Sequence, residues 1–439
     1  MKGIGIILKS LIQESKDGEW GKDEPLEDYV KMAVIRGTDF ESVREGKITA
    51  LPIRYIPKRI AERKTLQIND ILLETAGGSK DRPTGRSVFI KPSIIHQSDL
   101  PFTCASFSRF IRIDPTKADP SYIFWHLQYL YNAGYLLQYH TQHTGVARFQ
   151  YTVFSENEEL YLPPLPTQKK IAGILSAYDD LIENNTKRIK ILEEMAQILY
   201  HEWFVKFRFP GHEHTKMVDS ELGLIPEGWE VKKLDDIVLE IIDYRGKTPK
   251  KLGGDWSESG IIAISAKNIK QGKIINLDKS KFVDESLYKK WMKSELKQGD
   301  ILMTSEAPLG ELYYLVENKK FCLSQRVFSI RANPETLMPV ILYCALSSSI
   351  IQEQIYARQS GTTVLGIRQT ELRKVPVIVP SMGLQIPAAQ MLENLFKAIE
   401  TLEAKNSNLR QTRDLLLPKL ISGEIDVEQL DITTEDIAA

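Results

Sequence analysis

An internal repeat constrains this chain of 439 residues more than any other feature of its sequence. Five short segments of the first half return in the second half in the same order. Late in the repeat the spacing settles at about 217 residues, far above the roughly 20–50 residues of a solenoid, so we infer duplication of a whole domain. The matched segments are Ile35–Phe40 with Ile264–Ile269, Leu66–Leu72 with Leu296–Leu302, Gly145–Phe149 with Gly361–Leu365, Leu160–Pro164 with Val375–Pro380, and Gln168 with Gln385.

Each copy is predicted to be a mixed α/β domain. Short β-rich runs stand between Gly, Pro, Asp and Ser residues, a helical stretch follows them, and a proline-rich strand closes the globular part. The expected strands are Ile68–Leu73, Ser87–Ile90, Ile301–Thr304 and Val327–Ile330, the expected helices are Tyr122–Tyr139 and Pro339–Arg358, and the closing strands are Leu160–Pro166 and Val375–Pro380.

A long amphipathic helix follows each copy. Apolar residues recur there in alternating steps of three and four, which is the heptad pattern of helices that pack lengthwise on one another. At about 1.5 Å per residue each helix would span roughly 50–60 Å, more than a small domain, so the two helices are expected to pair. Asn185 and Asn406 interrupt the stripes and are expected to fix the register, and Pro418 should kink or end the second helix. The predicted packing residues are Ile182, Ile189, Leu192, Leu199, Ile399, Leu402, Leu409 and Leu416.

These patterns together predict an α+β protein. Two similar mixed α/β domains would be separated by two long antiparallel, coiled-coil-like helices and related by a pseudo-two-fold axis. The alternative is that each long helix is an ordinary surface helix of its own domain. The predicted boundaries are 1–165 for the first domain, 166–210 for the first helix, 211–222 for a linker, 223–382 for the second domain, 383–424 for the second helix and 425–439 for an acidic tail.

Composition and charge narrow the class of protein. The chain is 42% hydrophobic, which is enough apolar material for several cores, and no apolar run reaches the length of a membrane span. Cys104, Cys322 and Cys344 are too scattered for a disulfide framework or a zinc knuckle, so we expect a cytoplasmic protein. The formal net charge of −1 hides an acidic tail after Gly423 and the basic run Tyr244–Lys251, which could also be a solvated loop.

The motifs of several enzyme classes are missing. A DNA methyltransferase acting alone would need a glycine-rich cofactor loop and an Asn-Pro-Pro-aromatic motif, and Asn333–Glu335 lacks the second proline and the aromatic residue. Gly246–Thr248 lacks the earlier glycine of a nucleotide-binding Walker A loop. His212–His214 has no further ligands at suitable spacing, so we interpret it as a linker and predict no metal site. A nuclease stays open as an alternative, because Asp, Glu and Lys residues are common in any chain.

Three motifs lie at the borders of the predicted domains and helices. They are Gly223–Leu234, read as Gly-Leu-Ile-Pro-Glu-Gly-Trp-Glu-Val-Lys-Lys-Leu, Leu165–Leu175 and Leu415–Ile425. The three motifs resemble, in that order, the entry into the second target-recognition domain, the entry into the central conserved helix and the end of the distal helix in the specificity subunits of type I restriction-modification systems. The resemblance covers nearly the whole chain. One departure is that no Pro-x-Gly-Trp entry precedes the first copy, where only Gly18–Gly21 is found, so the start of that domain is left open.

The resemblance implies a non-catalytic subunit that recognises a bipartite double-stranded DNA site. Each target-recognition domain would read one half of the site, and the helices would dock two adenine methyltransferase subunits, to which two ATP-dependent restriction subunits are added. S-adenosylmethionine, ATP and Mg²⁺ would then be bound by the partner subunits and no cofactor by this chain. The alternative from another class is a scaffold whose helices bind protein while its domains bind something other than DNA.

DNA contacts require cations and polar groups for phosphates, and Arg, Lys, Asn or Gln for base edges. Basic and amide-bearing loops in both copies supply such residues, although exposed cations that touch only water would look the same. In the first domain the candidates are Arg36, Thr38, Lys80, Arg82, Arg86, Arg109 and Arg148. In the second domain they are Arg245, Lys247, Lys250, Lys267, Asn268, Gln325, Arg326, Thr362, Thr363 and Arg368.

Overall fold

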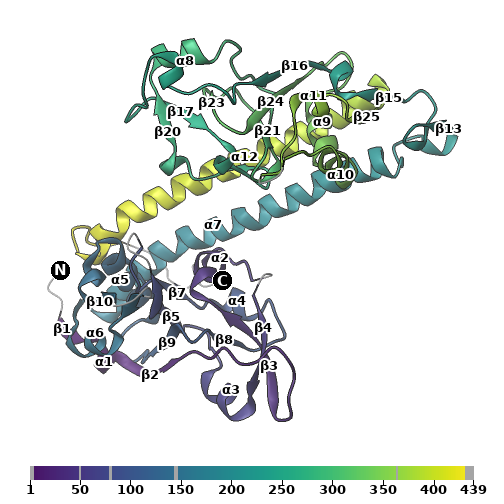
Figure 1. Cartoon of the computed structure of the whole chain (residues 1–439). Helices are drawn as coiled ribbons and strands as arrows, with labels where there is room; N and C mark the ends of the chain where they lie inside the picture. The colour runs from purple at the N-terminus through teal and green to yellow at the C-terminus, as the bar shows by residue number, and fades with distance from the viewer. Residues whose placement is uncertain (1–3, 49–50, 79–81, 143–146, 362–363, 431–439) are drawn as a thin grey trace. The chain divides into compact units, whose positions relative to one another are not determined.

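The computed structural model describes residues 4–48, 51–78, 82–142, 147–361 and 364–430. The chain forms two compact units (Figure 1). The first unit comprises residues 1–188 and 402–439, and the second comprises residues 189–401. The division between the units therefore falls within the two long helices, each of which contributes one part to each unit.

The first unit is built on two main sheets. A four-stranded sheet has the order β2-β9-β5-β7, and a three-stranded sheet has the order β4-β3-β8 with β3 and β8 parallel. The strands are β1 Ile4–Ile7, β2 Ile12–Asp17, β3 Tyr29–Ile35, β4 Ile53–Pro57, β5 Ile71–Glu74, β6 Ala76–Gly78, β7 Ser87–Phe89, β8 Phe102–Cys104, β9 Ser108–Ile113, β10 His140–Gln142, β11 Ala147–Phe149 and β12 Glu159–Leu162. The helices are α1 Leu8–Leu11, α2 Phe40–Arg44, α3 Lys58–Lys64, α4 Pro92–Ile95, α5 Pro120–Asn132 and α6 Tyr151–Asn157.

The second unit repeats this topology. Its four-stranded sheet has the order β16-β24-β21-β22, and its three-stranded sheet has the order β20-β17-β23 with β17 and β23 parallel. The strands are β13 Met217–Ser220, β14 Gly223–Pro226, β15 Glu230–Lys233, β16 Val238–Asp243, β17 Ile261–Ile264, β18 Ile269–Lys270, β19 Lys273–Ile274, β20 Lys281–Val283, β21 Ile301–Ser305, β22 Leu309–Tyr314, β23 Cys322–Leu323, β24 Val327–Ala332 and β25 Pro376–Val379. The helices are α8 Glu285–Trp291, α9 Pro339–Ser347, α10 Ser349–Ala357 and α11 Gln369–Leu372.

The same buried ion pair holds the four-stranded sheet of each unit. In the first unit Arg112 donates to both carboxylate oxygens of Asp70 at 2.8 Å. In the second unit Arg331 donates to both oxygens of Asp300 at 2.8 and 2.7 Å. Both aspartates are almost fully buried, at 0% and 1% exposure, and such charges persist only when paired. The predicted α+β class and the internal repeat are therefore confirmed at the level of individual contacts.

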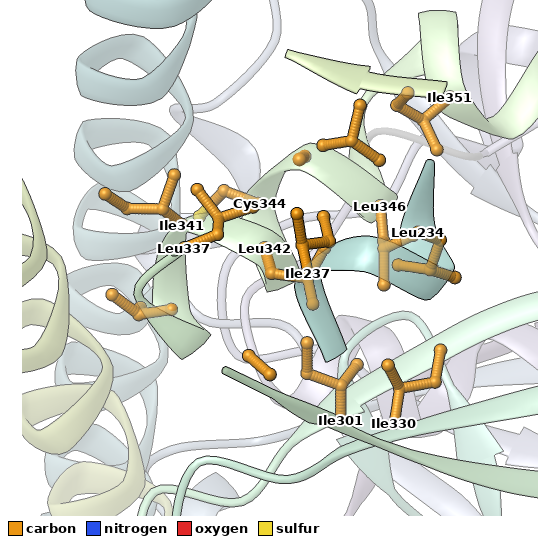
Figure 2. Close-up of a cluster of buried hydrophobic side chains, with 14 of the residues drawn as sticks. Leu234, Ile237, Ile301, Ile330, Leu337, Ile341, Leu342, Cys344, Leu346 and Ile351 are labelled. Carbon is orange, nitrogen blue, oxygen red and sulfur yellow. The ribbon is translucent and has the colours of Figure 1, made fainter. Parts of the chain in front are cut away.

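Helix α9 packs on the second unit's main sheet. Ile301 and Ile330 rise from that sheet toward Ile237 and Leu342, and Ile341 lies on another side of the helix in the same buried cluster (Figure 2). All five side chains are buried, which accounts for the run of apolar residues with little polar interruption in α9.

Both predicted mid-domain helices are shorter than expected. The stretch 339–358 is divided at Ser348, whose extended backbone ends α9 and whose side chain accepts from the backbone of Ile351 to cap α10. The stretch 122–139 ends as an α-helix at Asn132, and Gly134 with its left-handed φ of 72° starts a 3-10 turn. Periodicity could not show these breaks, because the apolar pattern continues through them.

The two long helices are α7, Leu165–Tyr200, and α12, Met382–Ile421. In the first unit they are antiparallel, because Asn185 Nδ2 donates to Asn406 Oδ1 at 2.9 Å while Asp179 pairs with Arg413 farther on. Helix α12 continues three residues past Pro418 and is followed by Gly423 with φ of 77°. Of the two predicted effects of Pro418, a kink or the end of the helix, the end of the helix is therefore wrong. A proline in the last turn costs only one backbone hydrogen bond.

The predicted packing residues differ in burial. In the first unit Ile182 and Leu402 are buried, whereas Leu409 and Leu416 are half-buried; in the second unit Ile189 and Ile399 are buried, whereas Leu192 and Leu199 are half-buried. A charged network adds to the apolar seam in the first unit. Asp179, which is 4% exposed, also accepts from Arg44 Nε of α2 at 2.9 Å.

The segment after α12 belongs to the packed first unit. Val427 is fully buried in the core that contains α5, and Lys170 donates to the backbone oxygen of Glu428 at 2.9 Å. The predicted start of an acidic tail at residue 425 therefore does not mark the end of packed structure. Among the helices of the described ranges, none has both the length and the apolar character needed to cross a membrane.

Candidate nucleic-acid interface

In the first unit, several loops converge on the residue that follows β5. Thr75 donates its backbone N–H to the oxygen of Phe107 at 2.9 Å, and its own oxygen accepts from the N–H of Phe149 at 2.8 Å. Ala76 is paired with Arg148 in the sheet β10-β11-β6. We call the segments 36–39, 74–78, 105–108 and 147–149 the first loop cluster.

The second unit contains an equivalent second loop cluster, formed by segments 265–268, 304–308, 324–326 and 366–368. Ser305 donates to the oxygen of Arg326 at 2.9 Å, and its oxygen accepts from Ile367 at 2.9 Å, as Thr75 does in the first unit. Arg326 and Ala307 adopt left-handed φ values of 64° and 48°. Such conformations cost of the order of 1–3 kcal/mol for residues other than glycine and concentrate at functional sites.

A buried carboxylate organises the cations of the first loop cluster. Glu74 is 2% exposed and accepts from Arg86 Nε and Nη2 at 2.9 and 2.7 Å. Arg86 Nη2 also donates to the oxygen of Gly37 at 2.6 Å, and Arg82 lies 3.5 Å from Glu74. The hydrogen bonds to Glu74 raise the pKa of Arg86 above its ordinary value. The guanidinium of Arg86 therefore orders the loops from inside.

The other candidates of the first unit fall into two groups. Arg36 forms a bidentate pair with Asp39, which raises the pKa of Arg36, and Arg109 pairs with Asp17 at 2.8 Å. Thr38 and Arg148 are exposed. Lys80 lies outside the described residues.

Asn268 does not present its side chain to a ligand. It is 4% exposed, its oxygen accepts from the backbone and hydroxyl of Ser265 at 3.0 Å, and its amide donates to Ser280 Oγ at 2.9 Å. Asp39 caps the same turn in the first unit by accepting from the backbone of Arg36. The structure therefore engages the Asn268 amide with backbone and hydroxyl groups inside the unit, and its contact with DNA stays a prediction.

The remaining candidates of the second unit are also divided. Arg245 pairs with Asp243 at 2.8 Å and lies 4.3 Å from the centre of the Phe328 ring. Lys247 donates to the oxygen of Trp291 at 2.6 Å, and desolvation lowers the pKa of Lys247. Those that are exposed are Lys250, Lys267, Gln325, Arg326 and Arg368, and Thr362 and Thr363 lie outside the described residues.

Sequence reasoning missed the acidic residues that hold these cations. Glu74 holds Arg86, and Glu306 accepts from Arg326 Nε at 2.9 Å. Their position in the sequence could have indicated these glutamates, since each lies at the end of a matched strand beside the loops that carry the cations. Within the described part of the chain no group of three or more His, Cys, Asp or Glu residues is arranged to hold a metal ion.

The fold defines a class of protein in which a mixed α/β module is duplicated and each copy presents cations and amides on a loop cluster. The family model described as type I restriction modification DNA specificity domain matches residues 8–194 and 226–411, one match for each copy. The chain belongs to this family. Membership assigns it sequence-specific DNA recognition in a type I restriction-modification complex.

Individual relatives agree with this assignment. The type I restriction enzyme MjaIX specificity subunit of Methanocaldococcus jannaschii is 29% identical over 309 residues, which are 70% of each chain. The putative type I restriction enzyme MjaX specificity subunit of the same organism is 24% identical and covers 96% of this chain and 93% of its own length. A crystal structure of the S subunit of a type I restriction-modification system from M. genitalium shares the fold over 95% of both chains, with a TM-score of 0.58 at 16% identity.

Proposed function

We propose that each unit reads one half of a bipartite DNA site through its loop cluster. The observation that carries this proposal is that the two clusters share one backbone frame and differ in their side chains. Thr75 and Ser305 make equivalent backbone hydrogen bonds, yet Arg148 in one unit stands where Gly366 stands in the other. A frame that is kept while its exposed side chains change suits two readers of different base sequences.

Burial and pairing separate the candidates that can contact DNA from those that order the loops. Side chains that are exposed in the clusters, such as Thr38, Arg148, Lys267 and Gln325, are placed to contact phosphates or base edges. Arg86, whose donors are engaged by Glu74 and Gly37, keeps the loops in one arrangement.

The helices are proposed to dock the methyltransferase subunits. In the second unit Ile191, Met195 and Ile198 of α7 are 55%, 49% and 62% exposed. Their spacing of four and three residues puts them on one face of the helix, where exposed apolar side chains favour a protein partner. We place catalysis, and with it S-adenosylmethionine, ATP and Mg²⁺, on these methyltransferase subunits and on ATP-dependent restriction subunits, two of each, with this chain as the non-catalytic reader.

A comparison of DNA methylation in the host with the gene intact and deleted tests the proposal. Loss of a single bipartite adenine-methylated motif on deletion, and its return on complementation, is the expected result. Complementation with Arg148→Glu should return less methylation at that motif, whereas Lys9→Glu, a charge reversal of an exposed residue outside the clusters, should restore it fully. Persistence of every motif in the deletion strain would contradict the proposed function. For this outcome to count, the strain with the intact gene must express the chain together with a methyltransferase subunit.

A further inference from the structure

Phe107 is an exposed aromatic residue in the first loop cluster. Its side chain is 62% exposed. Single exposed apolar residues are common on protein surfaces, but the backbone of Phe107 is fixed by hydrogen bonds. The backbone oxygen of Phe107 accepts from Thr75 at 2.9 Å and from Ala76 at 3.2 Å, and Ala105, two residues earlier, donates to Ile35 at 2.9 Å. The backbone that carries the phenyl ring is therefore fixed by these contacts, while the ring itself is exposed.

The repeat places Arg326 at the position of Phe107. Ser305 donates to the oxygen of Arg326 at 2.9 Å, as Thr75 does to Phe107. Two residues before Arg326, Ser324 donates to Ile264 at 2.8 Å, as Ala105 does to Ile35. Two independent backbone contacts thus give the same alignment, in which one surface position carries an aromatic ring in one unit and a guanidinium in the other.

Two arginines of the first unit contact the backbone segment that is hydrogen-bonded to Phe107. Arg148 is exposed and paired in the sheet with Ala76, whose N–H contacts the oxygen of Phe107. Arg82 donates to the oxygen of Gly77, the next residue. An apolar ring beside cations differs from the apolar patch that a protein partner requires, and it suits a DNA groove, where the cations face phosphates and the ring faces a base.

We propose that Phe107 is a specificity-determining residue that contacts the 5-methyl group of a thymine in the major groove of the first half-site. Arg326, its equivalent in the second unit, donates to a base at the corresponding place in the second half-site. This inference rests on the proposed function. Phenylalanine makes apolar contacts with the thymine methyl group, whereas arginine donates to guanine O6 and N7. Glu306 accepts from Arg326 Nε at 2.9 Å and so orients the guanidinium for that role.

Replacement of thymine by deoxyuridine tests this contact, because it removes only the 5-methyl group. The full chain in complex with its methyltransferase partner is assayed for binding to duplexes in which each thymine of the first half-site, one at a time, is replaced by deoxyuridine. At one position we expect affinity to fall about fourfold, which corresponds to about 0.8 kcal/mol for one buried methyl group. In complexes that carry Phe107→Ala or Phe107→Gln, the same replacement should change affinity by a factor near one.

Tyr161→Ala is the matched control, because Tyr161 is an aromatic residue of the first unit with 63% exposure that lies on β12, outside the loop cluster. This variant should keep the fourfold loss. A wild-type complex that tolerates deoxyuridine at every position of the first half-site overturns the inference without any variant. A loss that persists in both Phe107 variants also overturns it. The proposed function fails separately if the wild-type complex shows no preference for any DNA sequence.

Discussion

The buried Asp70 provides a quantitative test of how the first unit is held together. Arg112 donates to both of its carboxylate oxygens, and the backbone of Gln67 donates to Oδ2 at 2.7 Å. In the variant Asp70→Asn the shape is kept, but Arg112 loses its buried counter-charge. Breaking a buried ion pair from one side costs about 3–5 kcal/mol. Because Arg112 keeps Glu14, 2.7 Å away and one-third exposed, we expect the lower end of this range, about 3 kcal/mol.

The same substitution at Asp300 is the matched experiment in the second unit. A loss of about 3 kcal/mol corresponds to a fall of about 6–12 °C in the melting temperature of a unit of this size. Hydrogen exchange of the full chain, read on peptides from β5 and β9 and on peptides from β21 and β24, separates the two units. Asp70→Asn should speed exchange in the first pair of strands, and Asp300→Asn should do so in the second pair. A loss below about 1 kcal/mol in both variants would refute the reasoning, because a half-buried guanidinium would then tolerate the loss of its buried partner.

Three further predictions concern the helix pair and the DNA contacts. Burial by itself would raise the pKa of Asp179, but Arg44 and Arg413 outweigh it and the pKa lies below its ordinary value of 3.8. The carboxylate therefore stabilises the fold above pH 4. The stability lost in Asp179→Asn, measured by denaturant unfolding at several pH values, should be largest near neutrality and shrink as the pH falls below 4. A difference in stability that stays constant with pH would count against this account. Replacing both Asn185 and Asn406 with leucine should raise the melting temperature while weakening the choice of register between the helices. Cross-linking of engineered cysteines along the helix pair of the first unit can detect the loss of register as additional pairings. The single variant Asn185→Leu should be destabilising, and a neutral single variant would argue against the hydrogen bond between the two asparagines. Arg148→Ala should lower DNA affinity and reduce the slope of log K against log salt by about 0.9, the value for one phosphate contact, and an unchanged slope would place Arg148 away from the backbone.

The repeat can be predicted from the sequence because it consists of short patterns of neighbouring residues. Strand and turn residues recur in order, so the matched segments at Asp70 and Asp300 identify the same strand in both units from residue types alone. The long helices are equally evident, since a heptad stripe is a property of neighbouring residues. The ends of the helices are less evident, since Pro418 predicts a kink or a stop and the helix continues beyond it.

The candidate interface was only partly predictable. Arg148 and Arg326 were predicted to contact DNA because basic and amide-bearing loops are visible as composition, and the structure shows that both side chains are exposed. The internal hydrogen bonds of Asn268 could not be predicted, because nothing in the sequence shows that its amide is used inside the unit. The exposure of Phe107 could not be predicted, because an isolated aromatic residue in a sequence is more often part of a core than exposed on a surface.

The sequence by itself determined the duplication, the α+β class, the two long helices and the family, because each of these depends on residue types at fixed short spacings. Only the tertiary structure decided which cations are available to a ligand. Arg86 and Arg148 look alike in the sequence, yet one is bound to the buried Glu74 and the other is exposed. The physical reason is that a charge is held or left free by partners brought together from distant segments. The same contacts place Phe107 and Arg326 at one position of a shared frame, which is why the inference about base reading required the fold.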